Sequence, residues 1–341
     1  MTRESHSPSA LQHSTSLSDS SENGLLLSEL SPRDKPWDKH RAVAEVVEMF
    51  YANSDFSKLG ERISGCSKFL DFKLVPNNET GELNLKLSTT HFCRVRYCPV
   101  CQWRRSLMNK GKFIRILPKI LEDYPNARWI KLTLTCENCK IEDLRFTINH
   151  LNKSFQRLLQ RKDFPAIGWI KSIEVTKSKN HFIELETIID GKVTTKLTAS
   201  AHPHFHILMM VKTTYFVGKY LNKFQWVELW KSCLRVDYNP SVHVKAVPKC
   251  QDLLKCLPEL VKYQVKESDL IDDRDWFLEM NKQLYKTRAL EVGGILKSYL
   301  KALENEPEDL VGQGDDDEID EGHLFFAWQQ VKKHYKKVGE G

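Results

Sequence analysis

The chain has 341 residues, of which 41% are apolar and 28% are charged, so it is long enough for one large domain or two ordinary ones. Its longest apolar runs fall far short of a membrane span, and it does not begin with a basic and then apolar secretion signal. We therefore expect a cytoplasmic protein with no membrane partner. Nine cysteines in such a protein indicate reduced thiols and candidate metal ligands, not a disulfide framework.

The net charge of +6 hides an uneven distribution. Residues 302–322 hold ten acidic side chains and no basic one, which leaves 51 basic against 35 acidic side chains elsewhere, a net charge of +16. Such a basic remainder, in a chain with eight tryptophans, suits contact with phosphates and stacking on bases. A solvated basic face that binds nothing is the alternative explanation.

The first part of the chain divides into two segments. Residues 1–33 hold ten serines and one short leucine island, 25–27, which is too small to bury much surface, so we expect a disordered tail. Residues 34–125 are predicted to form a helical, cysteine-rich subdomain that binds DNA. It begins with an amphipathic helix over 37–52.

Residues 126–300 alternate strand-like and helix-like patterns. Strands are predicted at 129–135, 169–176, 182–189, 193–197, 202–211 and 242–247, and helices at 141–161, 216–234 and 257–266. Asp190 and Gly191 predict a hairpin turn between the third and fourth strands. This order predicts an α+β fold, with a central antiparallel sheet and helices packed on one face. An acidic linker over 301–322 and a C-terminal amphipathic helix within 323–341 are expected to follow.

Three histidines crowd into the start of the apolar segment 202–211. In a strand, His204 and His206 point to one face while Phe205 and Ile207 point into a core. Two imidazoles that project side by side from a rigid strand can hold a divalent metal. Surface histidines on a strand edge are the alternative.

The helix predicted over 257–266 places a phenol among charged groups. At 100° per residue its apolar positions share one face, and the other face carries Glu259, Lys262, Tyr263 and Lys266. A cationic neighbour favours the phenolate form of a tyrosine and makes it a usable nucleophile. An exposed helix with ordinary i,i+4 pairs is the alternative.

Three segments of the chain carry a family resemblance. They are Cys93-Arg94-Val95-Arg96-Tyr97-Cys98-Pro99-Val100-Cys101-Gln102-Trp103-Arg104-Arg105, then the histidine segment 202–206 with four apolar residues after it, and then Lys262-Tyr263-Gln264-Val265-Lys266-Glu267-Ser268-Asp269. In this order they resemble the signature segments of plasmid rolling-circle replication initiators, the Rep proteins of the HUH endonuclease superfamily. The similarity runs from about residue 36 to residue 299, and it implies an HUH-endonuclease-like βαββαβα core.

The resemblance implies a metal-dependent, site-specific single-stranded DNA endonuclease and strand transferase. His204 and His206 would hold the metal that polarises a scissile phosphate, and Tyr263 would attack it. The products would be a 5′-phosphotyrosyl link and a free 3′-OH. Plasmid origin DNA would be the substrate, a host polymerase would extend the 3′-OH, and a host helicase would be a further partner.

Other site residues follow from the same resemblance. Glu259, four residues before the tyrosine, would activate water to end replication by hydrolysis. Lys266 would bind the phosphate or stabilise the phenolate, and Lys262 would contact DNA or be a solvated charge. Glu174 resembles the strand carboxylate that completes the metal site of related initiators, and a polar-face glutamate on a half-solvated strand is the alternative. His202 shares the strand parity of His204 and His206 and is the weaker third candidate. The mixed nitrogen and oxygen ligands indicate Mg²⁺ or Mn²⁺.

The cysteines predict a separate zinc site. Cys98-x2-Cys101 is a good metal knuckle, and Cys66 and Cys93 complete a tetrahedral set of four thiolates. The pair at positions 136 and 139 is a rival, and free thiols that only pack are the alternative. A zinc knuckle would hold a rigid basic surface for origin DNA, formed by Arg94, Arg96, Arg104 and Arg105.

Three other functions remain open at this point. An HUH transposase or relaxase shares the histidine pair and the tyrosine but serves a different DNA. A zinc-stabilised DNA-binding regulator would have no catalytic activity. A metal hydrolase would use the histidines without a covalent step.

Overall fold

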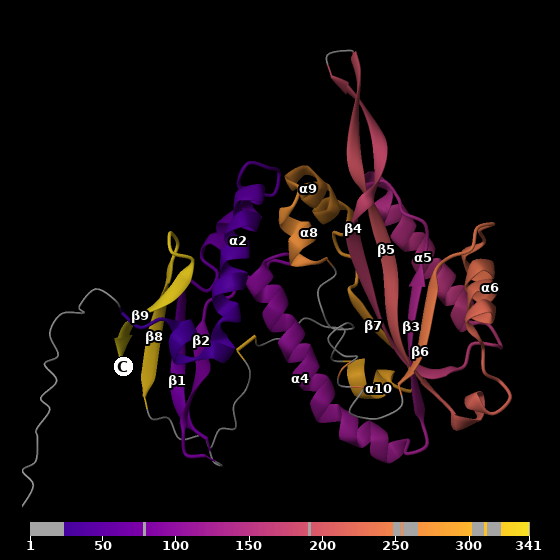
Figure 1. Cartoon of the computed structure of the whole chain (residues 1–341), viewed down its shortest axis with the longest axis horizontal. Coiled ribbons are helices and arrows are strands. Elements are labelled where there is room, and N and C mark those ends of the chain that lie inside the picture. Colours follow the sequence, from indigo (N-terminus) through magenta and orange to yellow (C-terminus); the bar gives the residue numbers. More distant parts are fainter. Residues whose placement is uncertain are drawn as a thin grey trace, which may run out of the picture.

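The computed structural model of the chain is shown in Figure 1. It describes residues 24–77, 80–189, 192–247, 253, 255, 265–301, 310–311 and 322–340, and the structural statements below concern those residues. None of the described helices combines the length and the apolar character that crossing a membrane requires.

Two antiparallel sheets organise the molecule (Figure 1). The smaller sheet has the strand order β2-β1-β8-β9, and the larger sheet has the order β6-β3-β5-β4-β7. Helices pack against both sheets. The predicted α+β class with a central antiparallel sheet is therefore confirmed.

The smaller sheet belongs to a unit that both ends of the chain build. Its elements are α1 (Leu27–Leu30), α2 (Pro36–Ala52), α3 (Ser57–Ser64), β1 (Phe69–Pro76), β2 (Leu83–Thr90), β8 (His323–Gln329) and β9 (His334–Glu340). Strand β1 lies between β2 and β8, so Leu70 is directly opposite Phe326. Trp37 of α2 packs edge-on against Phe72 and Tyr335, with ring centroids 6.5 and 6.4 Å away, so α2 covers one face of this sheet.

The C-terminal segment is a β-hairpin, so the helix predicted within 323–341 is wrong. Phe326 is fully buried and meets Phe72 edge-on at 5.8 Å, whereas its neighbour Phe325 remains 36% exposed. This alternation is that of a strand with one buried face. Pairing with β1, at the other end of the chain, decides the conformation, and a local pattern does not reveal such a contact.

The same hairpin orders part of the predicted tail. Residues 1–23 of that tail lie outside the described residues, but Leu27 is fully buried and Leu26 forms a bridge with Lys336 of β9. The leucine island is therefore part of the fold and not part of a disordered tail. The acidic linker predicted over 301–322 lies mostly outside the described residues, and within it Leu310 is buried.

The larger sheet is the centre of the middle part of the chain. Its strands are β3 (Arg128–Thr135), β4 (Ala166–Ile189), β5 (Lys192–Val211), β6 (Val242–Val247) and β7 (Leu290–Gly294). The helices around it are α4 (Pro99–Asp123), α5 (Leu144–Leu159), α6 (Lys223–Leu234), α8 (Glu267–Ile271), α9 (Arg274–Gln283) and α10 (Lys297–Leu300). Short 3₁₀ turns stand at Pro32–Asp34, Ile141–Asp143 and Thr213–Phe216.

Strand alternation gives the larger sheet two unlike faces. Phe205 and Ile207 point to the face that α5 and α6 cover, in one core with Phe155 of α5. On the other face, Leu208 packs in a second core with Phe113 of α4 and with α10. This second core covers only the part of the face around Leu208 and Met210 of β5. The part of the same face that carries His204 and His206 lies outside it.

Strands β4 and β5 extend past the sheet as a two-stranded ribbon (Figure 1). The sequence predicted four separate strands here, and the structure joins them into two long ones. The register shifts between Lys177 and Phe182, which is where the first predicted strand ended. The predicted turn at Asp190 and Gly191 lies outside the described residues.

Two connections join the smaller unit to the larger sheet. Helix α4 has 25 residues, about 37 Å at 1.5 Å per residue, and runs from one to the other (Figure 1). Helices α8 and α9 supply the second connection. His40 of α2 pairs with Glu267 of α8, and the Tyr51 hydroxyl donates to Asn281 Oδ1 at 3.0 Å.

Candidate active site

The register between β4 and β5 places a carboxylate beside two imidazoles. Glu174 of β4 is directly opposite His204 of β5, and Ser172 is opposite His206. Residues two apart on a strand share a face, so Glu174, His204 and His206 all project from the same side of the sheet. Phe205, between the histidines, is fully buried on the other side and fixes the orientation of the strand.

The three side chains meet at one carboxylate oxygen. Glu174 Oε2 lies 2.8 Å from His206 Nε2 and 3.5 Å from His204 Nε2. The two imidazole rings stand nearly at right angles, at 80°, with centroids 4.9 Å apart. Glu174 is only 3% exposed and His204 only 9% exposed, so water screens this cluster poorly.

Neighbouring groups turn the ε nitrogens of both histidines toward the glutamate. His204 Nδ1 lies 3.2 Å from the carbonyl oxygen of His202, and His206 Nδ1 lies 3.4 Å from the Thr133 hydroxyl. An Nδ1–H that donates to a carbonyl leaves Nε2 with the lone pair that a metal needs. No sequence pattern singled out Thr133, which lies in β3 directly opposite His206.

The geometry fits a divalent cation. Ligand atoms that lie about 2.1 Å from a metal and at right angles to each other are about 3.0 Å apart. The observed separations of 2.8 and 3.5 Å are close to that value, and the three donor atoms all lie within 4.8 Å of one another. One carboxylate and two imidazoles leave further coordination positions for water or a phosphate oxygen.

His202 is turned to a different partner. Its Nδ1 lies 2.7 Å from Asn138 Oδ1, and it is not a member of the ligand group among the described residues. Burial, and next the nearby His204, lower the pKa of His202. The structure therefore places Glu174, and not His202, in the ligand group, although the His202 ring lies only 5.2 Å from that of His204. No sequence pattern pointed to Asn138.

A second ligand group lies in the smaller unit, where four thiols converge. The Sγ atoms of Cys66 and Cys101, of Cys93 and Cys101, and of Cys66 and Cys98 are 3.7, 3.6 and 3.7 Å apart. A tetrahedral site with Zn–S bonds of about 2.3 Å requires sulfur atoms about 3.8 Å apart. A disulfide would require about 2.05 Å, so these distances fit a four-thiolate metal site and exclude a disulfide.

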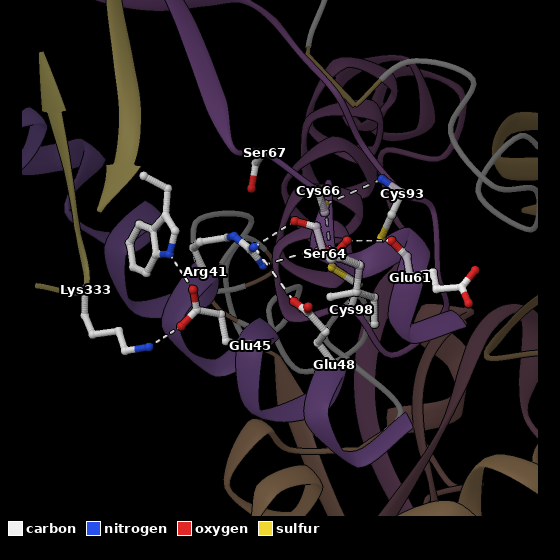
Figure 2. A network of polar contacts seen from close by, with 12 residues as sticks. Arg41, Glu45, Glu48, Glu61, Ser64, Cys66, Ser67, Cys93, Cys98 and Lys333 are labelled. Atoms are coloured by element: carbon white, nitrogen blue, oxygen red, sulfur yellow. Dashed lines mark hydrogen bonds and ion pairs between the residues drawn. The ribbon is translucent and has the colours of Figure 1, made fainter. Parts of the chain in front are cut away.

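The elements around the thiols hold them in place. Cys98 is the N-cap of α4 and Cys101 lies in its first turn, while Cys66 follows α3. Figure 2 shows Cys66, Cys93 and Cys98 near the buried Arg41, whose guanidinium donates to the carbonyl of Ser64 at 3.0 Å. All four cysteines are buried.

The chemistry of the donors also suits a metal. Burial is the largest cause that raises the pKa of the Cys98 thiol, and the neighbouring cysteines raise it further. Without a cation the Cys98 thiol would therefore remain neutral, whereas a bound zinc displaces the protons of its thiol ligands and binds the thiolates. The rival pair, Cys136 and Cys139, lies apart from this group, and Cys136 Sγ is 3.8 Å from the carbonyl oxygen of Pro203.

Comparison with known proteins gives the family. A family model described as "Replication protein" matches residues 84–336. The "Protein rep" of Streptococcus pneumoniae serotype 2 is 32% identical over 322 residues, with 91% of this chain and 94% of the relative covered. The chain belongs to the Rep family of plasmid replication proteins. The "Protein rep" of Lactiplantibacillus plantarum is 32% identical, with 93% and 97% covered, and that of Bacillus amyloliquefaciens is 33% identical, with 85% and 88% covered. No solved structure gives a significant match.

The residues that carry the predicted Rep nucleophile are only partly described. Tyr263, Glu259 and Lys262 lie outside the described residues. Lys266 is exposed and has an extended backbone, φ −66° and ψ 145°, as the N-cap of α8. The helix predicted over 257–266 therefore does not include Lys266.

The described residues on either side of that segment lie near different positions along β4, Leu253 in a core with Ile170 and Asp269 beside Lys177. Leu253 belongs to the core that α4 and α10 form at one end. After the segment, Val265 is fully buried, and Asp269 accepts from the backbone N–H of Lys177 at 3.0 Å. Lys177 is three residues past Glu174 on β4, so the metal-ligand group of this Rep protein lies between the two anchors.

The arginines of the predicted DNA surface contact the protein itself. Arg94 is exposed, whereas the guanidinium groups of the other three donate to backbone carbonyls. The acceptors are Leu284 for Arg96 (2.9 Å), Leu310 for Arg104 (2.8 Å) and Arg94 for Arg105 (3.0 Å). The contacts of Arg96 and Arg104 tie the region around the start of α4 to distant segments, and a DNA contact by these arginines stays a prediction.

We predict that Glu174→Gln weakens Mn²⁺ binding at least about tenfold, because it removes the anionic ligand of the group. Electron paramagnetic resonance of free Mn²⁺, titrated with DNA-free protein, measures this affinity. Glu184→Gln, at an exposed position on the β4–β5 ribbon, is the matched control and should bind as the wild type does. Equal affinities of the two variants would show that the metal binds elsewhere.

We also predict that the purified protein contains one structural zinc, measured by mass spectrometry of the metal. Cys98→Ser should lower the zinc content and the melting temperature, because the buried serine leaves the metal with three thiolates. Cys233→Ser changes a buried cysteine outside the group and should retain the zinc. A wild-type protein free of zinc, with all four thiols titratable, would rule the site out.

Proposed function

We propose that this Rep protein initiates rolling-circle replication by nicking one strand of a plasmid origin through Tyr263. One observation carries the proposal: a carboxylate and two imidazoles converge on one point, at the end of the sheet face that α4 and α10 do not cover. Membership in a family of plasmid replication proteins identifies origin DNA as the substrate class. The reaction would take place in the cytoplasm, where plasmid DNA is replicated.

The metal-holding residues are Glu174, His204 and His206. A bound Mg²⁺ or Mn²⁺ would act there as a Lewis acid, which lowers the charge that builds on the phosphate oxygens. The protein's contribution is to fix three donors on paired strands, so that little reorganisation is needed when the phosphate arrives. Thr133 and the carbonyl of His202 support this by holding the two imidazoles.

In the proposed step, the Tyr263 hydroxyl oxygen attacks the phosphorus in single-stranded DNA. A phosphorus–oxygen bond forms to the phenol, the bond from phosphorus to the 3′ oxygen breaks, and the phenol proton leaves as the 3′ oxygen gains one. The 5′ end stays on the protein, and the free 3′-OH primes synthesis. Because the phosphodiester is exchanged and not lost, strand transfer can reverse the link without ATP.

The described residues on either side of the tyrosine segment, residues 256–264, support the assignment of Tyr263 as the nucleophile. Leu253 packs at the α4 end of the sheet face, and Asp269 is fixed beside Lys177 beyond the other side of the metal ligands. Tyr263 belongs to the segment 256–264 that joins these anchors, and in the proposal it acts beside the group that includes Glu174. We propose that the tyrosine and the metal ligands, far apart in sequence, act on one phosphate.

Other charged residues take supporting roles in the proposal. Glu259 activates water to hydrolyse the link when replication ends, and Lys266 binds the phosphate or stabilises the phenolate. Lys262 and the four arginines, Arg94, Arg96, Arg104 and Arg105, contact the DNA backbone. A host helicase and a host polymerase would act after the nick.

We predict that Tyr263→Phe abolishes a covalent protein–DNA adduct. The test incubates protein with Mn²⁺ and a labelled single-stranded origin oligonucleotide, and then resolves adducts under denaturing conditions. Phenylalanine keeps the ring but lacks the attacking oxygen, so no link can form. An adduct that persists in the variant would remove Tyr263 from the mechanism, and cleavage without any adduct in the wild type would indicate a metal hydrolase.

Glu259→Gln should spare nicking and slow the final release of the protein from DNA, because glutamine cannot act as a general base. Pre-formed adducts of wild type and variant are followed over time, and only the wild type should lose the label by hydrolysis. If nicking itself disappears in the variant, Glu259 serves the first step and not the last.

A further inference from the structure

A group of exposed aromatic rings lies at the end of the larger sheet opposite to the metal ligands. The sequence predicted a helix over 216–234, but α6 begins only at Lys223, because Asn222 caps it and Gly218 has a φ of +93°. Phe216, Tyr220 and Phe224 are 37, 51 and 71% exposed. We call residues 212–224 the aromatic loop.

The rings of the aromatic loop are held in fixed positions. Tyr215 is only 4% exposed, and its hydroxyl accepts from the backbone N–H of Leu221 at 3.1 Å. Phe216 lies 5.2 Å from this buried ring, and Tyr220 lies 5.7 Å from it. Phe216 and Tyr220 stack on each other at 28°, with centroids 6.1 Å apart. Rigid rings lose little entropy when a ligand binds them.

The loop borders a hollow with a basic wall. The hollow has a volume of about 480 Å³, and Lys162, Lys212 and Lys219 line it, with Asp163 as the one acidic residue among its lining residues. The aromatic loop itself contains three lysines and no acidic side chain. Exposed rings beside positive charge make a surface for a flat, anionic ligand.

We propose that the aromatic loop binds single-stranded DNA, as a second site separate from the metal centre. Every base has an aromatic face that can stack on a ring, and lysines neutralise the backbone, so this chemistry binds single strands without reading their sequence. In a duplex the base faces are hidden by stacking. A protein partner would use the exposed rings but has no general need for the lysines.

The distance along β5 separates the aromatic loop from the metal ligands, where the strand would be nicked. His204 and Val211 are seven residues apart on β5, about 23 Å at 3.3 Å per residue. That span corresponds to about seven nucleotides of a stacked strand at 3.4 Å each. The loop would hold a strand at a distance from the cleaved phosphate. That role in replication rests on the proposed nicking function, whereas the binding itself does not.

The test measures the affinity for an oligothymidylate of about 16 nucleotides by fluorescence anisotropy. All proteins carry Tyr263→Phe, and no Mg²⁺ or Mn²⁺ is added, so neither cleavage nor a metal-bound phosphate contributes. Phe216→Ala and Tyr220→Ala should each weaken binding at least about fivefold. Tyr285→Ala is the matched control, because Tyr285 is 63% exposed beside Lys286 on another surface, and it should bind normally.

A salt titration tests the charged half of the site. Lys219→Gln should reduce the slope of log affinity against log salt concentration by about 0.7, the value for one phosphate contact with a single strand. Melting temperatures of all variants establish that the exposed changes leave the fold intact. Unchanged affinity in both ring variants overturns the proposal and is the result expected of a protein-docking surface. An equal loss in Tyr285→Ala also overturns it, because the binding would then not belong to the aromatic loop.

The same variants distinguish this proposal from the nicking function. In proteins that retain Tyr263, Phe216→Ala should form the covalent adduct normally on an oligonucleotide that extends only a few nucleotides from the nick. Failure of the wild type to form that adduct would contradict the nickase and leave the anisotropy result to stand on its own.

Discussion

The register of β4 against β5 is the constraint on which the candidate active site depends. Glu174 is opposite His204, and a shift of one residue would turn one set of ligands to the other face of the sheet. The apolar residues between the ligands prevent such a shift. Phe205 and Ile207 fill the core under α5 and α6, so moving them into water would cost several kcal/mol, about 1.5 to 3 for each side chain. The core thereby fixes the direction of the histidines.

The second constraint is the attachment of the smaller unit to the segment that follows Tyr263. Helix α8 is held from two sides, by Lys177 of β4 through Asp269 and by His40 of α2 through Glu267. His40 in turn stacks on Trp103 of α4, with centroids 4.8 Å apart. The cysteine group lies at the start of that same helix. A continuous set of contacts thus links the four thiols to the chain that leads out of the tyrosine segment.

The sequence predicted the parts of this protein that local pattern determines. Alternation in 202–211 placed the histidines on one face, and the spacing of Cys98 and Cys101 identified a knuckle that the structure completes with Cys66 and Cys93. The class of fold followed from the order of strands and helices.

Predictions from the sequence were wrong or incomplete where pairing between distant segments determines the structure. In the C-terminal hairpin the exposed Phe325 interrupts the alternation of apolar and polar residues that identifies a strand. The hairpin is stabilised by pairing with β1, which lies in the N-terminal part of the chain. Asn138, which holds His202, comes from a loop with no pattern of its own. The arginines at the start of α4 matched a DNA-binding pattern, while three of them donate to backbone carbonyls that no sequence rule identifies.

The central claim is that Tyr263 and the metal-ligand group act on one phosphate. A crystal structure of the Tyr263→Phe protein with Mn²⁺ and a single-stranded origin oligonucleotide tests it most directly. We expect Mn²⁺ bound by Glu174, His204 and His206, with a phosphate oxygen as a further ligand and the ring of residue 263 directed at that phosphorus. Mn²⁺ bound at another site, or residue 263 on a surface away from the bound strand, would contradict the account.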